Sequence, residues 1–252
     1  MVRVKICGIR SLEEAKWAID DGADAIGFVF VPQSKRYIQP ELAREISLNL
    51  PPFIARVGVF VNEDPTIVAE IVQKSHLTAI QLHGTEALED YQNIRVPCIK
   101  AINISVDPII NSDGAPASPG DQPFFELQHP LNKWKGMLQG ILVDASYQGQ
   151  LGGTGSPLPW DDPSLQRLFD RIRSFDIPLI LAGGLTPENV QRAIQAVKPY
   201  AVDVSSGVER LGAKHPDLIK SFIEKAKESR WKKLCGRCIR PGHSRTAHFS
   251  KE

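Results

Sequence analysis

Two ionisable side chains stand at the ends of apolar segments that have the length of β-strands. Cys7 closes the segment that begins at Val2 and directly precedes Gly8, and Asp144 closes the segment GILVD at 140–144. A thiol or a carboxyl at such a position either fills space in the core or takes part in a reaction. A reactive role is possible because burial and nearby charges shift the pKa of such groups at functional sites. The elements that position the two residues decide between these interpretations.

Apolar segments and helical patterns alternate along almost the whole chain. Eight segments are expected as strands and seven as helices, from their length, periodicity and capping signals. The strands are expected at 2–6, 25–30, 54–61, 78–82, 97–102, 140–144, 177–182 and 201–206, and the helices at 11–21, 40–49, 65–75, 85–93, 163–174, 187–197 and 215–229. This alternation predicts an α/β protein with a closed (β/α)8 TIM barrel, and an open doubly wound sheet is the alternative.

Three helix starts carry capping signals. Ser11 and Glu14 have the spacing of a capping box, and Asp64 stands before a proline as an N-cap does before a first-turn proline. Thr186 stands before Pro187 in the same way, which predicts a helix start there.

Polar residues occupy the inward positions of several expected strands. Side chains alternate along a strand, and in a barrel the apolar set faces the surrounding helices, so the other set points inside. This set is Lys5, Cys7, Gln81, His83, Asp144 and Asp203. Unpaired polar groups are costly inside a barrel, and barrel enzymes carry their chemistry at the carboxyl ends of strands. A structural ion pair of Lys5 with Asp203 is the alternative for those two residues.

Small residues follow the later strands and indicate a phosphate site. Glycine lets a backbone approach a ligand closely, and the loops after strands seven and eight are the usual phosphate site of this barrel. The expected phosphate residues are Gly183, Gly184, Ser205, Ser206 and Gly207. Gly153, in the segment GGTG at 152–155, is a weaker candidate because flexible loops are often rich in glycine.

Composition argues against several classes of protein. Lysine and arginine number 30 against 29 aspartates and glutamates in 252 residues, so no global basic field suggests nucleic acid. No segment has the roughly 18 apolar residues of a membrane span, and the start MVRVKICGIR lacks the apolar core of a signal peptide. We expect a cytoplasmic protein without structural disulfides.

Two segments depart from the alternation. Residues 103–139 contain a Ser, Pro, Gly and Asp cluster, which predicts a loop insertion before strand six within one catalytic domain at 1–228. Residues 229–252 form a basic tail that is expected to be disordered. Its residues Cys235, Cys238, His243 and His248 have the spacing Cx2Cx4Hx4H, which resembles a zinc knuckle, so zinc binding is the alternative.

Seven motifs together resemble the phosphoribosylanthranilate isomerase family of tryptophan biosynthesis. They cover residues 2 to about 228 apart from the insertion. The motifs are VKICGIRS, GFVFVPQSKRYI (27–38), VGVFVN (57–62), IQLHG (80–84), LVDASYQGQLGGTG (142–155), LAGGLTPENV (181–190) and VDVSSGVE (202–209).

The resemblance implies the isomerisation of N-(5-phosphoribosyl)anthranilate to 1-(2-carboxyphenylamino)-1-deoxyribulose 5-phosphate. It implies Cys7 as general base, Asp144 as general acid and Arg36 as the ligand of the anthranilate carboxylate. Gln81 and His83 would line the pocket, Asp203 would support it, and the glycine and serine loops would hold the phosphate. A phosphorylated small molecule is the implied substrate; no cofactor or metal is implied, and the chain is expected as a monomer or homodimer.

The implied roles require shifted pKa values. Asp144 has to be protonated, so its pKa must rise above about 3.9, and burial would raise it. Cys7 has to be a thiolate, so its pKa should fall below about 8.5, and Lys5 on the same strand is the candidate for lowering it.

Two other functions are weighed against this one. A barrel isomerase of an aminoimidazole ribose phosphate would be expected to carry aspartate where Cys7 stands. A catalytically silent phosphate-binding barrel could act through its basic tail, but the presence of Cys7, Asp144 and Arg36 argues against it.

Overall fold

The computed structural model describes residues 1–105, 109–110, 116–117, 134, 136–146 and 158–228. Gly153, most of the expected insertion and the whole tail lie outside these residues, including the candidate zinc ligands Cys235, Cys238, His243 and His248. Within the described part of the chain, no helix is long and apolar enough to cross a membrane.

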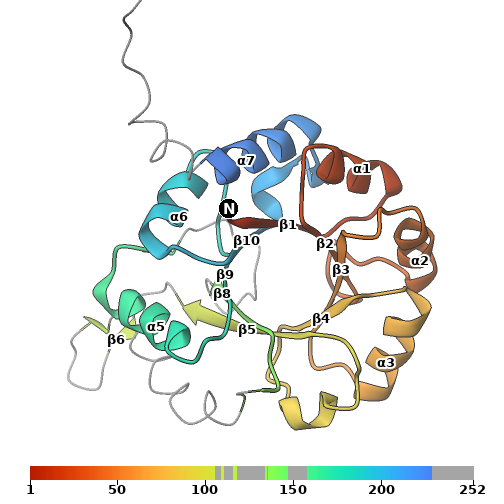
Figure 1. Ribbon diagram of the computed structural model, residues 1–252, viewed down its shortest axis with the longest axis horizontal. Coiled ribbons are helices and arrows are strands. Elements are labelled where there is room, and N and C mark those ends of the chain that lie inside the picture. The colour runs from red at the N-terminus through yellow and green to blue at the C-terminus, as the bar shows by residue number, and fades with distance from the viewer. Residues whose placement is uncertain (106–108, 111–115, 118–133, 135, 147–157, 229–252) are drawn as a thin grey trace, which may run out of the picture.

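Eight parallel strands close into a barrel, as the alternation of elements predicts. The order around the barrel is β1-β10-β9-β8-β5-β4-β3-β2. The strands are β1 (Arg3–Cys7), β2 (Ala25–Val29), β3 (Ala55–Phe60), β4 (Ala79–Leu82), β5 (Cys98–Ser105), β8 (Gly140–Ser146), β9 (Leu179–Leu181) and β10 (Ala201–Val204). Figure 1 shows this ring of strands with helices around its outside. The closed (β/α)8 TIM barrel is therefore confirmed.

Helices and short turns connect the strands. The α-helices are α1 (Leu12–Asp20), α2 (Pro40–Leu48), α3 (Pro65–Lys74), α5 (Pro163–Arg173), α6 (Val190–Val197) and α7 (Pro216–Glu228), and the 3₁₀ turns are η1 (Leu88–Tyr91) and η2 (Ser206–Val208). Two small antiparallel sheets pair β6 (Ile109–Ile110) with β7 (Pro116–Ala117) and β11 (Glu209–Arg210) with β12 (Ala213–Lys214). The capping predictions hold at α1, where Ser11 accepts from the Glu14 N–H, and at α3, where Asp64 accepts from the Thr66 N–H.

Two expected helices differ from the structure. The helix expected at 85–93 is only the turn η1 (Leu88–Tyr91), because the Glu86 carboxylate accepts the Asn62 and Gly84 N–H groups and pairs with Lys100 instead of starting a helix. Lys100 and Glu86 are both buried, so this pairing fixes the segment after β4 as a loop.

The helix expected to start at Pro187 begins at Val190 instead. The Thr186 hydroxyl accepts from the Glu188 N–H at 3.2 Å, so Thr186 caps the turn that precedes the helix rather than the helix itself. The side chain of Asn189 accepts from the Thr186 N–H and donates to the Gly184 carbonyl, both at 2.8 Å, and so closes a turn before the helix. This turn keeps the glycine loop after β9 compact.

Strand β5 is longer than expected. It runs to Ser105, so Asn103 and Ile104 belong to the barrel and the insertion begins later than residue 103. The turn residues of the expected insertion start only after this point, whereas the apolar alternation of the strand continues through Ile104.

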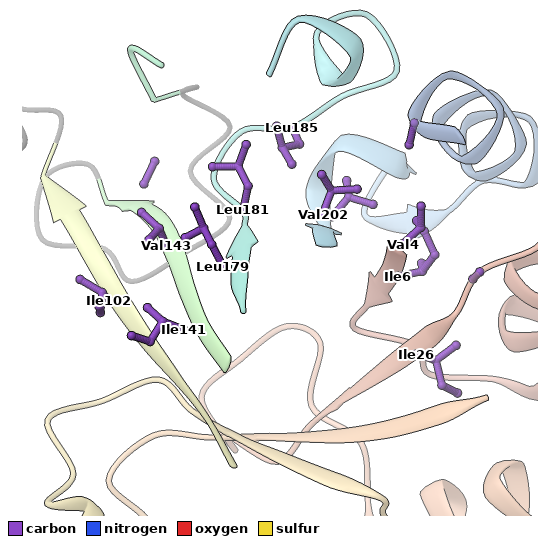
Figure 2. Packing of buried hydrophobic residues seen from close by; sticks show 14 of the residues in the cluster. Val4, Ile6, Ile26, Ile102, Ile141, Val143, Leu179, Leu181, Leu185 and Val202 are labelled. Atoms are coloured by element: carbon purple, nitrogen blue, oxygen red, sulfur yellow. The ribbon is translucent and has the colours of Figure 1, made fainter. Parts of the chain in front are cut away.

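The main hydrophobic core lies between the strands and the helices. It includes Val4, Ile6, Ile141, Val143 and Val202 from the strands, together with helix residues such as Leu168 and Phe222. Figure 2 shows side chains of this core on neighbouring strands of the barrel. Two smaller clusters use the opposite strand face: one contains Leu142 and Ile180, and the other contains Cys7, Val29 and Val59. The alternation therefore separates outward from inward side chains as the sequence predicts.

Candidate active site

A chain of polar side chains crosses the interior of the barrel. The Lys5 ammonium donates to the side-chain oxygen of Gln81 and to the Asp203 carboxylate, both at 3.0 Å. Because β1 and β4 are not neighbours in the barrel, this contact requires Lys5 and Gln81 to point inward. The ion pair of Lys5 with Asp203, which the sequence left as the structural alternative for these two residues, is present. Burial alone would lower the pKa of Lys5, but the charges of Asp203 and Cys7 outweigh it and raise this pKa.

His83 continues this polar chain toward Asp144. The side-chain nitrogen of Gln81 lies 3.1 Å from Nδ1 of His83, and Nε2 of His83 lies 3.1 Å from Oδ1 of Asn103. The same Nε2 is 3.5 Å from Oδ2 of Asp144. Burial lowers the pKa of His83, so the imidazole is neutral near pH 7 and its contact with Asp144 is not an ion pair.

Asp144 is a buried carboxyl on β8. Burial raises the pKa of Asp144 to about 7, and the negative charge of Asp203 acts in the same direction. Roughly half of these carboxyls therefore carry a proton at neutral pH. This agrees with the raised pKa that a general acid at this position requires.

Cys7 is the last residue of β1 and is also buried. Burial is the largest influence on the thiol and raises the pKa of Cys7 above its ordinary value of 9.0, whereas the Lys5 and Lys214 ammonium groups lower it by less. The expectation that Lys5 brings this pKa below about 8.5 is therefore wrong. Lys5 is paired with Asp203, whose negative charge raises the pKa of the same thiol and offsets part of the lysine's effect.

Arg36 lies in the loop after β2 and is paired with an acidic residue, Glu209. Its Nε donates to Oε1 of Glu209 at 2.7 Å, and its Nη2 donates to Oε2 at 2.9 Å. Lys214 also donates to Oε1 of Glu209, at 2.8 Å. Burial opposes the ionisation of Glu209, but Arg36 and Lys214 outweigh it and lower the pKa of Glu209 to about 2. The two-bond pairing therefore fixes the plane of the guanidinium.

Arg36, Glu209 and Lys214 form one cluster, which is connected to the backbone of Cys7 through Ser205. The Lys214 ammonium donates to the Ser205 carbonyl at 2.9 Å, and the Ser205 hydroxyl donates to the Cys7 carbonyl at 3.0 Å. A hydroxyl has one proton, so the Ser205 side chain has no second donor for a phosphate. The backbone N–H of Ser205 is the group that can still donate to a phosphate.

Two glycines let the loops after β9 and β10 approach the barrel closely. Gly183 has a φ of +81°, and a Cβ atom there would lie 2.4 Å from the backbone nitrogen of Ala145. A Cβ atom on Gly207 would lie 1.8 Å from the carbonyl oxygen of Leu185. Neither position has room for a side chain, so the two loops pack backbone against backbone. Gly184 and Ser206 lie in the same two loops, and Gly153 is outside the described residues.

Glu209 and Lys214 were not predicted as site residues. They lie on β11 and β12, two-residue strands that are too short to show a sequence pattern. The signal in the sequence at the turn between the strands is Gly212 alone. Leu211 and Gly212 both adopt positive φ, 52° and 79°, as a two-residue type I′ hairpin requires, but leucine does not favour this conformation, so the turn is not evident from the sequence.

Asn103 is the third site residue that was missed, because it was assigned to the insertion. Its position on β5 continues the inward set that includes Ala101, whereas Ile102 and Ile104 belong to the outer core. Extending the strand pattern to Ile104 would have placed Asn103 beside the other inward polar residues.

The described part of the chain contains no group of three or more His, Cys, Asp or Glu residues that could hold a metal ion. The inward polar residues instead form the hydrogen-bonded chain described above. What the arrangement offers chemically is a partly protonated carboxyl, a buried thiol and an oriented guanidinium at one end of the barrel.

Comparisons with known proteins agree with this geometry. The family described as N-(5'phosphoribosyl)anthranilate (PRA) isomerase matches residues 4–225. A relative named N-(5'-phosphoribosyl)anthranilate isomerase from Desulfitobacterium hafniense is 48% identical over 90% of this chain and 98% of its own length. One of the same name from Thermotoga maritima is 45% identical over 90% of this chain and 99% of its own length.

Solved structures of this family have the same fold. Phosphoribosyl anthranilate isomerase from Thermotoga maritima is 43% identical, with a TM-score of 0.73 over 90% of this chain and 99% of that one. Another such structure, described as a complex with reduced 1-(o-carboxyphenylamino)-1-deoxyribulose 5-phosphate, has 43% identity and a TM-score of 0.70 over the same shares of the two chains. On the match of the family over most of its length, the chain belongs to the N-(5'-phosphoribosyl)anthranilate isomerase family.

Proposed function

We propose that Cys7 is the general base and Asp144 the general acid of the isomerisation of N-(5-phosphoribosyl)anthranilate, a step of tryptophan biosynthesis. The observation that carries this assignment is the pKa of about 7 for Asp144, which supplies a carboxylic acid proton at neutral pH. Cys7 and Asp144 stand on β1 and β8, with β10 and β9 between them in the barrel. A substrate in the mouth of the barrel can therefore meet the two groups from different sides.

The first step opens the ribose ring. Asp144 gives its proton to the ring oxygen as the bond from that oxygen to carbon 1 breaks. The nitrogen of the anthranilate supplies the electron pair that forms the Schiff base. His83, neutral and hydrogen-bonded to Asn103, stands beside Asp144 during this transfer.

The second step moves a proton from carbon 2 of the ribose. The Cys7 thiolate removes this proton. The electron pair of the broken C–H bond forms the double bond of the enolamine as the Schiff-base nitrogen becomes neutral. The enolamine then tautomerises to the ketose, 1-(2-carboxyphenylamino)-1-deoxyribulose 5-phosphate. The overall change is an Amadori rearrangement in which no atom is gained or lost.

The remaining predicted residues bind the substrate. Arg36 binds the anthranilate carboxylate, because its pairing with Glu209 uses two of its five N–H donors and leaves the others for an anion. The backbone N–H groups of Gly183, Gly184, Ser206 and Gly207, with that of Ser205, hold the phosphate. Gln81 and Asp203 shape the floor of the site through Lys5. Gly153 stays a prediction for the phosphate.

Turnover of freshly generated N-(5-phosphoribosyl)anthranilate, followed by loss of anthranilate fluorescence, tests the proposal. We expect activity in the unmodified protein and a loss of about 10²–10⁴-fold in kcat/KM for both Cys7→Ser and Asp144→Asn, since each removes one proton-transfer group. Circular dichroism of each variant controls for folding. A folded Asp144→Asn variant that keeps its full rate would rule out Asp144 as the acid.

We also propose that the chain assembles as a homodimer. Another solved relative is described as monomers generated from the dimeric Thermotoga maritima isomerase, which favours the homodimer over the monomer here. Sedimentation velocity measures this directly. A cytoplasmic location, one catalytic domain at 1–228 with its insertion, no nucleic-acid partner and a disordered tail at 229–252 stay predictions.

A further inference from the structure

Four side chains form a directed chain of hydrogen bonds whose direction is set at one end. Lys5 donates to the side-chain oxygen of Gln81, and Gln81 contacts His83, which contacts Asn103. Lys5 is a cation paired with Asp203, and an ammonium group can only donate hydrogen bonds. The atom of Gln81 that faces Lys5 therefore has to be the oxygen.

Each following hydrogen bond is then determined by the one before it. With its oxygen toward Lys5, Gln81 presents its NH₂ group to Nδ1 of His83 at 3.1 Å, so Nδ1 has to accept. A neutral imidazole with an accepting Nδ1 carries its proton on Nε2. That N–H donates to the Asn103 oxygen at 3.1 Å, which in turn sets the orientation of the Asn103 amide.

The position of Asp144 makes this choice of tautomer matter. Nε2 of His83 is 3.5 Å from Oδ2 of Asp144, and both side chains are largely buried. In the other tautomer Nε2 would carry a lone pair toward a carboxylic acid and would accept its proton in a hydrogen bond. The proton that the ring oxygen of the substrate needs would then be directed to the imidazole.

We propose that Gln81 is a positioning residue that locks His83 as the neutral Nε2–H tautomer, so that the imidazole cannot compete with the substrate for the proton of Asp144. This rests on the proposed role of Asp144 as the general acid. Gln81 acts through His83, and Lys5 acts through Gln81. The buried lysine thus contributes to the acid on the opposite side of the barrel as well as to the floor of the site.

The tautomer can be read directly from two-bond ¹H–¹⁵N spectra of the full-length protein labelled with ¹⁵N-histidine. The chain has six histidines, and the signal that disappears in His83→Gln identifies the relevant ring. We expect a protonated Nε2 and an unprotonated Nδ1 for His83 at pH 8. A protonated Nδ1, or rapid averaging of the two tautomers, would overturn the proposal.

Two matched variants give opposite expectations for the same ring. Gln81→Glu and Asn103→Asp each replace an amide by a carboxylate of the same shape, one on each side of the imidazole. A carboxylate can only accept, so Gln81→Glu should move the proton of neutral His83 to Nδ1, whereas Asn103→Asp should leave it on Nε2. The same tautomer in both variants would show that Gln81 does not set it.

The consequence for catalysis is tested separately. We expect Gln81→Glu to lower kcat about 10-fold with a smaller change in KM, because a competing hydrogen bond to the Asp144 proton has to be broken in the transition state. An unchanged kcat together with a switched tautomer would overturn the catalytic part. The spectra contain no substrate, so they stand even if the Asp144→Asn assay removes Asp144 as the acid.

Discussion

Cys7 and Asp144 are almost equally buried, at 8% and 7% exposed, yet burial favours the proposed role of only one of them. Burial raises the pKa of both groups. For Asp144 this keeps a proton available near pH 7, as an acid requires. For Cys7 it opposes the thiolate that a base requires. The same low-dielectric interior therefore favours the protonated Asp144 that the acid role requires and disfavours the Cys7 thiolate that the base role requires.

The charges around the two residues do not remove this difference. Lys5 and Lys214 lower the pKa of Cys7, but burial and Asp203 leave it above 9.0. With Asp144 at about 7, the acid has the lower pKa of the pair. Among the molecules that hold one proton on the pair, only a minority then carries the thiolate and the carboxylic acid together. In the free protein this single proton stands mostly on the Cys7 thiol, which is the unproductive arrangement.

The largest effect is expected from the removal of Lys5, which should lower stability and widen the pKa difference between Cys7 and Asp144. In Lys5→Met the buried Asp203 loses its partner at 3.0 Å, which should cost about 3–5 kcal/mol of unfolding free energy. The pKa of Cys7 should rise further because a charge that lowers it is gone. Urea unfolding and the pH dependence of thiol alkylation, with Cys7→Ala to identify the signal, measure the two effects.

Lys100→Met is the matched control for that variant. Lys100 is also a buried lysine with a buried acidic partner, Glu86, but its charge does not act on Cys7. We expect a comparable loss of stability with an unchanged alkylation profile for Cys7. Equal thiol pKa values in Lys5→Met and the unmodified protein would mean that Lys5 does not influence the base.

A smaller effect is expected at the carboxylate-binding side of the site. Glu209→Gln should raise KM about 10-fold with little change in kcat, because Arg36 loses its charge-assisted two-bond partner and the orientation this gives. Steady-state kinetics measures the change. In an Arg36→Lys background, which has no planar fork to orient, the same substitution should add little; a full additional 10-fold would show that Glu209 acts independently of Arg36.

The smallest effect on activity is expected at Cys98, a half-buried thiol, whereas Cys7 is buried. Cys98 begins β5, and burial raises its pKa to about 12, but it stands at the amino end of its strand, away from the polar chain. Cys98→Ala should leave kcat and KM within about twofold, as substitutions away from a site usually do. A large loss of activity in this variant would show that burial of a thiol, rather than its place at the carboxyl end of a strand, is what matters.

Much of this site could be predicted from the sequence, because strand parity is a local rule. The alternation around Val4 and Ile6 was sufficient to place Lys5 and Cys7 inside the barrel, and the same rule placed Gln81 and Asp203. Asn103 was missed because nearby turn residues obscured the end of its strand. The link between Arg36 and Glu209 joins residues 173 positions apart, which no local pattern contains.

The pKa of Cys7 could not be predicted from the sequence for a different reason. It depends on a balance between desolvation and three charges from separate elements. The sequence indicates that Lys5 lies near the thiol along the strand and that Asp203 could pair with it, but not how far this partner on the neighbouring strand offsets the effect of the lysine. Only the arrangement in space shows that burial outweighs the lysine.

The central claim, a base whose pKa lies above that of the acid, is tested most directly by the pH dependence of kcat/KM beside that of Cys7 alkylation. The productive form carries a single proton, on Asp144. The rate should therefore rise with pH through about 7, as the first of two protons leaves the pair, and fall again above 9.0, as the second leaves. The alkylation pKa of Cys7 should match the falling limb. A thiol pKa below 7 would contradict the account.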